Sequence, residues 1–484
     1  MTPSLQLRPY QQEDINKLCK YKTCGILNRP RTGKTPTSLI LSSKWPKGRL
    51  LIVCTGSMLY KWQAEHKLWL NEPCEVYTGT EKQRQKALDN WTHGLIVTYD
   101  TLKRINHYLK QTEEEKEAGA EKIYSHTTGA IDIIRKYKPV KLIVDEFHRA
   151  KGYNTARAHA LNLLAKDIPY RVCLTGTPAY STQLDVYNML KFLWPEQDDF
   201  STWWKFRQKY VEHGKIWINR NGNLTQQEVP IKLNNIGIKL VHKLFEKYCV
   251  QRKTNDPDVM PWLPKEPVPE LIKLPTEKTQ EKALKDLEKW FETDDETIIA
   301  KNGLDRITKY RQIISEPNIL LNNYKGYGPK TKWVLNYLKE YIDTPTIYFT
   351  NSTKHIKILL PLMQKITPTA CIIGATSLKE RAEIEKQFQS GKIKHLICNT
   401  KAAQEGLTLD IAETEIFIEQ FPPYGSVDQA SKRFTPTTQE KATIPKRIIK
   451  LILRDTYDEV INNIIESREE NVNVLNNFKQ YIKR

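Results

Sequence analysis

The sequence predicts an α/β protein in which two parallel-sheet domains follow one another, with helical insertions and a Pro-rich linker. Short apolar runs typical of buried strands alternate with helical stretches from residue 24 to 180 and again from 346 to 453. Six prolines between residues 257 and 275 separate the two series. A chain of 484 residues is long enough to form more than one hydrophobic core.

The first predicted strand, residues 24–27, leads into a loop and then into a helical stretch that begins near Gly33-Lys34-Thr35. This order of elements is typical of a phosphate-binding loop. Backbone N–H groups at a helix N-terminus bind an anion, Gly33 permits close approach, and Lys34 adds positive charge. Thr35 supplies a hydroxyl for a phosphate-bound Mg²⁺. Asn28 stands where the usual pattern begins with Gly or Ala.

A second predicted strand, residues 141–144, ends in the acidic pair Asp145-Glu146. Ligands of open parallel sheets bind at the carboxyl ends of the strands, so the pair is expected at such a site. One carboxylate can hold Mg²⁺ and the other can act as general base on an attacking water. The alternative is an ordinary acidic pair at the surface end of a strand.

The remaining strand predictions rest on apolar, β-branched runs of five to seven residues. In the first domain they cover residues 49–55, 95–100 and 170–174; in the second domain they cover 346–350, 370–374, 395–400, 414–419 and 447–453. Each run has the length of a strand that is buried on both faces of a parallel sheet.

An aromatic-rich helical stretch follows the first series of strands, and an aromatic core is favoured there over a base-stacking platform. Within it, residues 215–229 resemble a β-hairpin that turns at Asn221-Gly222. Trp217 and Arg220 on such a hairpin could wedge a DNA duplex open. An edge hairpin without that task is the alternative.

The chain is strongly basic, with a formal net charge of +19 from 75 Lys and Arg against 56 Asp and Glu. Such an excess indicates a polyanionic partner, and nucleic acid is the best candidate. No apolar run approaches the ~20 residues that span a bilayer, so no membrane association is expected. The N-terminus lacks a secretory signal, and the scattered cysteines fit reduced thiols. We therefore expect a cytoplasmic protein.

Five stretches in order resemble motifs of superfamily 2 helicases, and more narrowly of their Swi/Snf-type branch. They are LRPYQ (7–11), TGKT (32–35), IVCTGSMLYKW (52–62), DEFH (145–148) and LTGTP (174–178). Branch-specific stretches continue the resemblance: VYNMLKFLWPE (186–196), QRKTNDPDVMPWLPKEP (251–267), RQIISEPNIL (311–320), EGLTLDIAE (405–413) and DTYDE (455–459). The resemblance extends from Leu7 to about Asn462.

The resemblance implies two RecA-like domains and an ATP-dependent motor that moves on DNA. The implied divisions are a first RecA-like domain at 1–183, a helical insertion with the hairpin at 184–250, a linker or brace at 251–275, a second helical insertion at 276–325, and a second RecA-like domain at 326–484. ATP and Mg²⁺ are the implied substrate and metal, and duplex or branched DNA is the implied partner.

The resemblance also assigns roles to single residues of the first domain. Gln11 reads adenine, Gly33, Lys34 and Thr35 bind phosphates, Thr35 and Asp145 hold Mg²⁺, and Glu146 positions the attacking water. The expected DNA contacts are Thr55, Thr400, Trp217 and Arg220.

In the second domain the resemblance places Gly406 and Gln429 near the nucleotide and matches Arg433 to the first arginine of motif VI. Pro436 occupies the position of the second arginine. Arg433 or its neighbour Lys432 could replace that arginine, or hydrolysis could be slow.

The chain's compact size and its Lys/Asn/Ile-rich composition favour a bacteriophage-type helicase that remodels forks or migrates Holliday junctions in a bacterial cytosol. A monomer is plausible, and the oligomeric state is left open. The alternatives are a DNA-binding ATP clamp with little or no turnover, a duplex translocase, and an RNA helicase subunit.

Overall fold

The computed structural model describes residues 6–102, 107–108, 124–125, 129–220, 223–265, 267–290, 303–403, 407–419, 433–463 and 466. Two compact units make up the chain, and the boundary between them falls between Pro261 and Trp262. Each unit is built around a parallel sheet with its own hydrophobic core, as the sequence predicts.

The sheet of the first unit has seven strands, and every neighbouring pair is parallel. In spatial order they are β11 (Cys249–Val250), β1 (Thr23–Ile26), β8 (Tyr170–Leu174), β7 (Lys141–Val144), β2 (Leu50–Cys54), β4 (Gly94–Thr98) and β3 (Cys74–Val76). The interior strand β2 is buried along its whole length, which explains its continuous apolar sequence.

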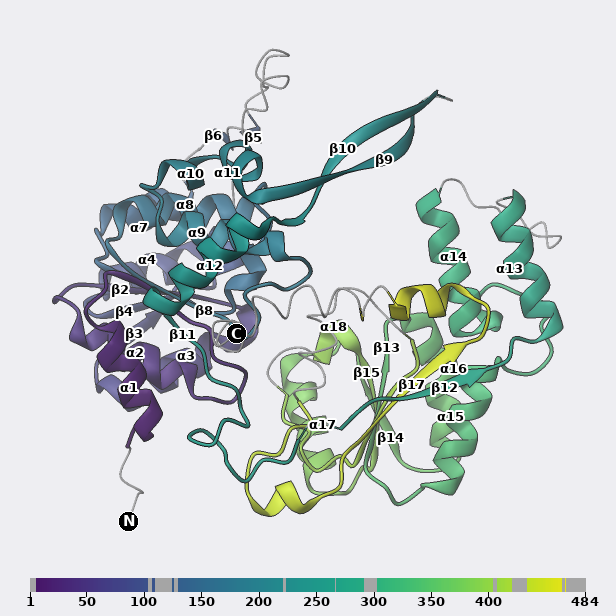
Figure 1. Cartoon of the computed structure of the whole chain (residues 1–484). Coiled ribbons are helices and arrows are strands. Elements are labelled where there is room, and N and C mark those ends of the chain that lie inside the picture. The colour runs from purple at the N-terminus through teal and green to yellow at the C-terminus, as the bar shows by residue number, and fades with distance from the viewer. Residues whose placement is uncertain are drawn as a thin grey trace. The chain divides into compact units, whose positions relative to one another are not determined.

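Helices alternate with these strands along the chain and cover the sheet (Figure 1). They are α1 (Pro9–Leu18), α2 (Lys34–Lys44), α3 (Leu59–Leu70), α4 (Glu81–Asp89), α5 (Tyr99–Leu102), α7 (Ala130–Lys136) and α8 (Ala156–Asp167). Two further strands, β5 (His107–Tyr108) and β6 (Tyr124–Ser125), pair antiparallel apart from the main sheet. The alternation places each connecting loop after a strand at the carboxyl edge of the sheet.

A helical insertion follows β8 and consists of α9 (Val186–Leu193), α10 (Asp198–Ser201), α11 (Trp203–Tyr210) and α12 (Asn235–Tyr248). Its aromatic residues pack on one another: the ring of Tyr187 lies 5.1 Å from that of Trp203 and 5.0 Å from that of Phe206. Phe200 and Phe206 are almost completely buried. These rings form the predicted aromatic core, in which a nucleic-acid base could not stack on them.

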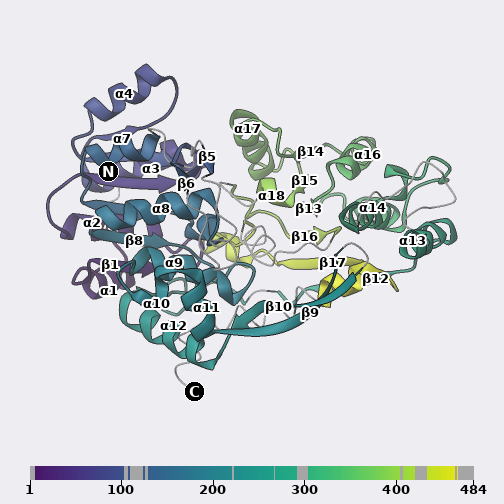
Figure 2. The ribbon, with the colours of Figure 1, turned by 90° about the horizontal axis from the view of Figure 1, so that it is seen from above.

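A two-stranded antiparallel ribbon connects α11 to α12 and is formed by β9 (Val211–Arg220) and β10 (Asn223–Leu233). The expected hairpin at 215–229 is thus extended at both ends. Its base is anchored, since the Leu233 N–H donates to Gln183 Oε1 at 3.1 Å. Figure 1 and Figure 2 both show the ribbon projecting away from the helices that it joins.

The second unit contains a six-stranded sheet, again with parallel neighbours throughout. In spatial order the strands are β12 (Glu270–Leu274), β17 (Arg447–Leu453), β16 (Thr414–Phe417), β13 (Thr346–Thr350), β15 (His395–Asn399) and β14 (Thr369–Ile372). The helices are α13 (Lys278–Trp290), α14 (Gly303–Ser315), α15 (Pro329–Glu340), α16 (Thr353–Gln364), α17 (Leu378–Gln389) and α18 (Thr400–Ala403).

Strand β12 lies inside the stretch expected to be linker, residues 251–275. It pairs with β17 over five residues, so the end of that stretch supplies an edge strand of the second sheet. The edge strands β3 and β11 were likewise not predicted, whereas the edge strand β14 and the interior strands of both sheets were.

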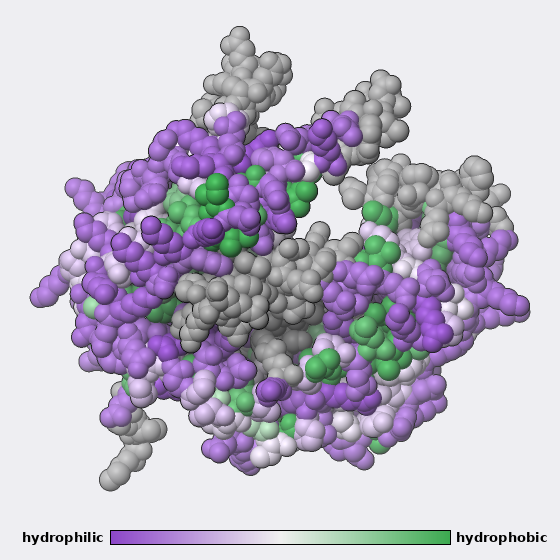
Figure 3. Space-filling model, in the orientation of Figure 1, coloured by the Kyte–Doolittle hydropathy of each residue, from purple (hydrophilic) through white to green (hydrophobic). Residues whose placement is uncertain are grey.

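Hydrophilic residues predominate on the face of the molecule that Figure 3 shows. Among the described residues, no helix combines the length and the apolar character that crossing a bilayer requires. All eight cysteines are free and six of them are buried, in agreement with the expectation of reduced thiols.

The second unit contains a buried ion pair between a lysine and an aspartate. Lys330 Nζ, in the first turn of α15, is 2.5 Å from Asp458 Oδ2, and the side chains are 0% and 6% exposed. Asp458 also accepts the Leu453 N–H at 3.2 Å. The pair therefore links the start of α15 to the chain that follows β17.

Asp458→Asn should lower the free energy of unfolding by about 3 kcal/mol, because it leaves a buried ammonium without its carboxylate. Chemical denaturation of the whole chain, followed by circular dichroism, measures the change. The control is Asp343→Asn, whose partner Lys394 lies at a similar 2.6 Å but whose side chain is 87% exposed. That variant should lose less than about 1 kcal/mol. Equal losses in the two variants would contradict the role given to the buried pair.

Candidate nucleotide site

The phosphate loop occupies the turn between β1 and α2, as predicted. Gly33 is the N-cap of α2 and has a left-handed backbone, with φ of 70°. The backbone conformation therefore favours glycine, and a Cβ atom at this position would lie 2.3 Å from Gln11 Nε2 and displace that amide. Lys34 and Thr35 follow in the first turn of the helix, where free backbone N–H groups favour an anion.

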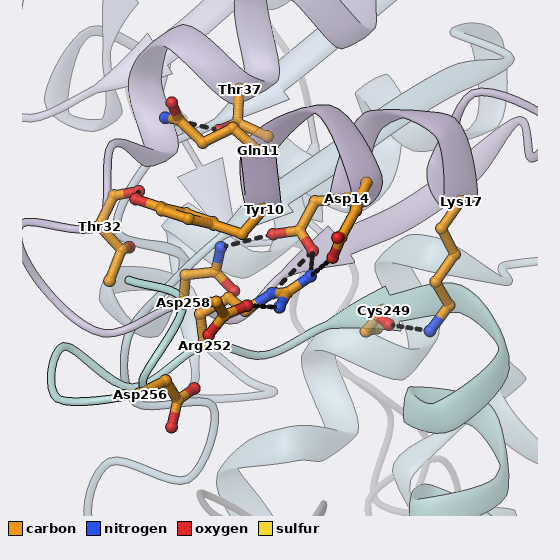
Figure 4. Close-up of polar contacts among 12 residues, drawn as sticks. Tyr10, Gln11, Asp14, Lys17, Thr32, Thr37, Cys249, Arg252, Asp256 and Asp258 are labelled. Atoms are coloured by element: carbon orange, nitrogen blue, oxygen red, sulfur yellow. Dashed lines mark hydrogen bonds and ion pairs between the residues drawn. The ribbon is translucent and has the colours of Figure 1, made fainter. Parts of the chain in front are cut away.

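Helix α1 holds the end of this loop through two side chains (Figure 4). Tyr10 Oη donates to the Thr32 carbonyl at 2.9 Å. Gln11 Nε2 donates to the Gly33 carbonyl at 3.1 Å and to Thr37 Oγ1 at 3.3 Å. Both side chains are at most 5% exposed. The amide of Gln11 thus braces the loop in this structure. To pair with adenine, it would have to give up these hydrogen bonds.

Asp145 lies directly after β7, and three hydrogen bonds hold it, two at the carboxylate and one at its backbone carbonyl. Trp62 Nε1 donates to Oδ2 at 2.9 Å, and the Glu146 N–H donates to Oδ1 at 2.9 Å. Tyr99 Oη donates to the Asp145 carbonyl at 2.6 Å. Burial and the nearby charge of Glu146 raise the pKa of Asp145 to about 6, against the lowering effects of Trp62 and Lys34.

Glu146 has a left-handed backbone, with φ of 49°, which is uncommon for a residue other than glycine. His148 Nδ1 lies 3.3 Å from Glu146 Oε2 and 3.5 Å from Thr175 Oγ1. The His148 ring also stacks on Tyr180, with centroids 4.6 Å apart and planes at 6°. Glu146 is therefore connected through one histidine to the segment that follows β8.

The phosphate loop and the two carboxylates lie at one edge of the sheet. Strands β1 and β7 both pair with β8, from opposite sides. Their carboxyl ends are therefore two strand spacings apart, roughly 10 Å. The residues fit a magnesium-bound triphosphate, because a cation would stabilise the ionised form of the buried Asp145 carboxyl. Thr35 and Asp145 would hold the metal.

The two threonines predicted to contact DNA lie at strand ends in different units. Thr55 follows β2, and its Oγ1 is 3.1 Å from Ser57 Oγ. Thr400 follows β15 as the first residue of α18 and is 2% exposed. Trp217 and Arg220 belong to β9, but their side chains are not among those that the structure describes.

Of the second-unit residues predicted at the nucleotide, Gly406 and Gln429 lie outside the described residues. The carbonyl of Arg433 accepts the Leu409 N–H at 3.0 Å. Thr437, next to Pro436, donates its N–H to Asp410 Oδ2 at 3.2 Å. Burial opposes ionisation of Asp410, but hydrogen bonds from its neighbours hold its pKa below the ordinary value.

Sequence reasoning did not identify several residues that position this site. Tyr10 stands beside Gln11 within a recognised motif, so its aromatic character was a usable signal, and Trp62 ends another of the recognised motifs. Tyr99 directly follows β4, at the same edge of the sheet as the predicted site. Asp14 and Arg252 are far apart in the sequence, and no pattern relates them.

Comparison with known proteins shows two family matches along the chain. Residues 11–319 match the SNF2-related domain, and residues 329–435 match the helicase conserved C-terminal domain. A solved structure, the helicase domain of Pyrococcus furiosus Hef, is similar to this chain with a TM-score of 0.50 at 16% identity, over 94% of this chain and 97% of that one. The similarity agrees with two α/β domains in tandem.

Two curated relatives cover most of this chain at low identity. Chromodomain-helicase-DNA-binding protein 1-like of Danio rerio is 23% identical over 95% of this chain and 43% of its own length. DNA annealing helicase and endonuclease ZRANB3 of Homo sapiens is 22% identical over 88% of this chain and 37% of its own length. The chain thus spans less than half the length of either relative.

These relatives come from animals, so they give no support to the expected bacteriophage-type branch. The broader expectation of a Swi/Snf-type helicase chain is confirmed at the level of the family. The SNF2-related match alone covers well over half of the 484 residues. With the helicase C-terminal domain following it, the chain belongs to the SNF2-related family of helicase-type ATPases.

Proposed function

We propose that this chain hydrolyses ATP when bound to DNA and uses the hydrolysis to move along duplex DNA and to remodel branched DNA. The proposal rests mainly on one observation. In this SNF2-related chain the phosphate loop lies at the same edge of the sheet as Asp145 and Glu146. The net charge of +19 supports a nucleic-acid partner. The names of both relatives refer to DNA.

In this proposal the first unit binds the nucleotide and activates water. Lys34 and the N-terminus of α2 hold the phosphates, while Glu146 acts as general base. His148 keeps the Glu146 carboxylate oriented through their 3.3 Å contact. Bound Mg²⁺ would neutralise phosphate charge beside Thr35 and Asp145. Thr55 and Thr400 would contact the DNA backbone.

The second unit would complete the site with positive charge. Arg433 is the proposed contributor, since an arginine near the transferring phosphoryl stabilises its charge. Gly406 and Gln429 would lie close to the nucleotide. Because Pro436 replaces a second arginine, the alternative function is an ATP-dependent DNA clamp with little turnover.

Adenine recognition by Gln11 remains part of the proposal. Its Nε2 atom already donates to Gly33 and Thr37. Base recognition therefore requires that ATP binding reorganise the same side chain that braces the loop. Selectivity for ATP over GTP would then be coupled to loop geometry.

The preference for branched DNA rests on two supports. One relative is named a DNA annealing helicase and endonuclease. The other support is the projecting β9–β10 ribbon, whose tip carries Trp217 and Arg220 in its sequence. An aromatic residue and a cationic residue near the tip of a ribbon are residue types suited to contact with a junction.

Glu146→Gln should lower kcat for DNA-stimulated phosphate release by about 10²-fold or more while nucleotide binding persists, because the general base is lost. Turnover is measured with no DNA, duplex, single strand, fork and four-way junction. Glu81→Gln, an exposed substitution in the first turn of α4, is the control and should retain full activity. A wild-type chain that binds ATP but releases no phosphate on any DNA would favour the clamp.

The pH dependence of kcat/KM follows from Asp145. Its carboxyl must be ionised to hold Mg²⁺, and its pKa is about 6, so activity should fall as the pH drops below that value. Trp62→Phe removes a hydrogen bond that lowers this pKa, so the acid limb should move to higher pH. In the control Trp91→Phe, the lost bond goes to the His93 carbonyl, and the limb should not move. An unchanged limb in Trp62→Phe would contradict the role of Asp145.

Replacing residues 214–229 by a short Gly-Ser turn should leave duplex-stimulated ATPase activity within about twofold of wild type and abolish fork regression, because only the ribbon is removed. Trp217→Ala should reproduce much of the effect, since base stacking on an aromatic ring is lost. Gel-based assays of fork and junction substrates give the readout. Full fork regression without the ribbon would show that the ribbon is not needed to remodel branched DNA.

A further inference from the structure

The phosphate loop is also held at its first residue, where Asn28 replaces the usual Gly or Ala. Asn28 Nδ2 donates to Asp14 Oδ2 at 3.1 Å. Asn28 is 0% exposed and Asp14 is 2% exposed. Asp14 lies on α1, on the same face as Tyr10 and Gln11, which hold the other end of the loop. A glycine at position 28 could not make this bond.

The other oxygen of Asp14 binds an arginine from the end of the first unit. Arg252 Nε and Nη2 donate to Asp14 Oδ1 at 3.0 and 2.8 Å (Figure 4). Arg252 Nη2 also donates to Glu13 Oε2 at 3.0 Å, and Nη1 pairs with Asp258. The Asp14 carboxylate therefore bridges Asn28 and Arg252, with one oxygen for each.

Arg252 belongs to the exit segment, residues 249–260, after which the chain leaves the first unit. The backbone of this segment runs beside the loop. The Leu27 N–H donates to the Val250 carbonyl at 2.8 Å, and the Arg29 N–H donates to the Arg252 carbonyl at 2.9 Å. Thr254 Oγ1 donates to the Pro30 carbonyl at 3.2 Å. The exit segment thus forms one wall of the loop.

Helix α1 is fastened to the exit segment at both ends as well. Lys17 Nζ donates to the Cys249 carbonyl at 2.8 Å, and Arg8 Nη1 donates to the Val259 carbonyl at 3.4 Å. The guanidinium of Arg252 lies 5.7 Å from the centre of the Tyr10 ring. Arg252 therefore stands where helix, loop and exit segment meet.

We propose that Arg252 is a positioning residue for nucleotide binding, which acts through Asp14 on Asn28 and so fixes the start of the phosphate loop. The inference rests on the proposed function insofar as the loop's ligand is ATP. Loss of Arg252 removes two donors from a buried carboxylate, and the carboxylate can then no longer hold the Asn28 amide in one orientation. Loop geometry, and with it nucleotide affinity, depends on the segment that leads to the second unit.

The test is a double-mutant cycle between Arg252→Gln and Asn28→Gly in the full chain. Binding of a fluorescent ATP analogue with Mg²⁺ is measured by titration, alongside the thermal midpoint of unfolding. Each single variant should weaken binding about tenfold, as expected for loss of a hydrogen bond to a charged group. The double variant should be no weaker than the weaker single variant, because both break the same link.

Arg171→Gln is the matched control. Arg171 is 5% exposed, and its guanidinium donates to the carbonyls of Ala165, Ile168 and Leu193, away from the loop. This variant should lower the thermal midpoint and leave nucleotide affinity unchanged. It thus separates loss of stability from loss of positioning.

A second variant covers the case in which Arg252→Gln fails to fold because Asp14 is left charged. The pair Asp14→Asn with Arg252→Gln removes both charges and keeps side chains of similar size. It should fold and still bind the analogue about tenfold more weakly than wild type, by the same loss of a charged hydrogen bond. Arg252→Lys should give partial rescue, since one ammonium cannot reproduce the two-nitrogen contact.

The proposal would be overturned if the loss of affinity in the double variant equalled the product of the losses in the two single variants. It would also be overturned if Arg252→Gln bound the analogue with wild-type affinity. These outcomes are distinct from failure of the proposed function, because the assay reads binding and needs no hydrolysis. A wild-type chain that binds the analogue without DNA-stimulated turnover would refute the motor and leave the positioning role standing. A wild-type chain that binds no nucleotide would overturn both.

Discussion

Parallel pairing of β1, β8 and β7 is the constraint on which the candidate site depends. Parallel strands end at the same edge of a sheet, so the loop after β1 and the carboxylates after β7 meet at that edge. β8 lies between them and leads to Thr175, which approaches His148. The spacing of the three strands therefore sets the distances between phosphate-binding, metal-binding and base groups. A shift in the register of any one strand would separate those groups.

The sequence patterns identified strands according to their place in the sheet. Interior strands such as β2 and β13 are buried throughout and have continuous apolar sequences that predict them. Three of the four edge strands, β11, β3 and β12, escaped prediction for physical reasons. β11 has two residues, β3 has three, and β12 is mostly exposed with the mixed sequence ELIKL. A strand that is so short or so exposed has little hydrophobic pattern, so its sequence resembles that of a loop. The edge strand β14 was predicted because it lies in the apolar run ACIIG.

For the candidate site, too, the sequence indicated some residues and not others. Residue types that carry the chemistry, such as Lys34 and Asp145, stand in short local patterns with a physical reason for their spacing. The residues that orient them are held by contacts across long sequence distances. Trp62 is 83 residues from Asp145, and Arg252 is 238 residues from Asp14. Such pairs leave no periodicity in the sequence and become visible only after the chain has folded.

The contacts around the phosphate loop have a common electrostatic purpose. A loop that binds an anion must present N–H groups to it, and a carbonyl oxygen that faces the anion would repel it. Here side chains donate to carbonyls at several loop positions: Tyr10 to Thr32, Gln11 to Gly33, Thr254 to Pro30, and Lys34 to Arg29 at 3.3 Å.

In each of these bonds a carbonyl oxygen accepts a hydrogen bond from a side chain. That oxygen is then not turned toward the phosphates. The donors come from α1, from the exit segment and from the loop's own lysine. These elements lie around the loop, and each of them reaches different carbonyls. The anion site is therefore a property of the first unit as a whole, and the bridge from Arg252 through Asp14 to Asn28 extends the same control to the loop's first residue.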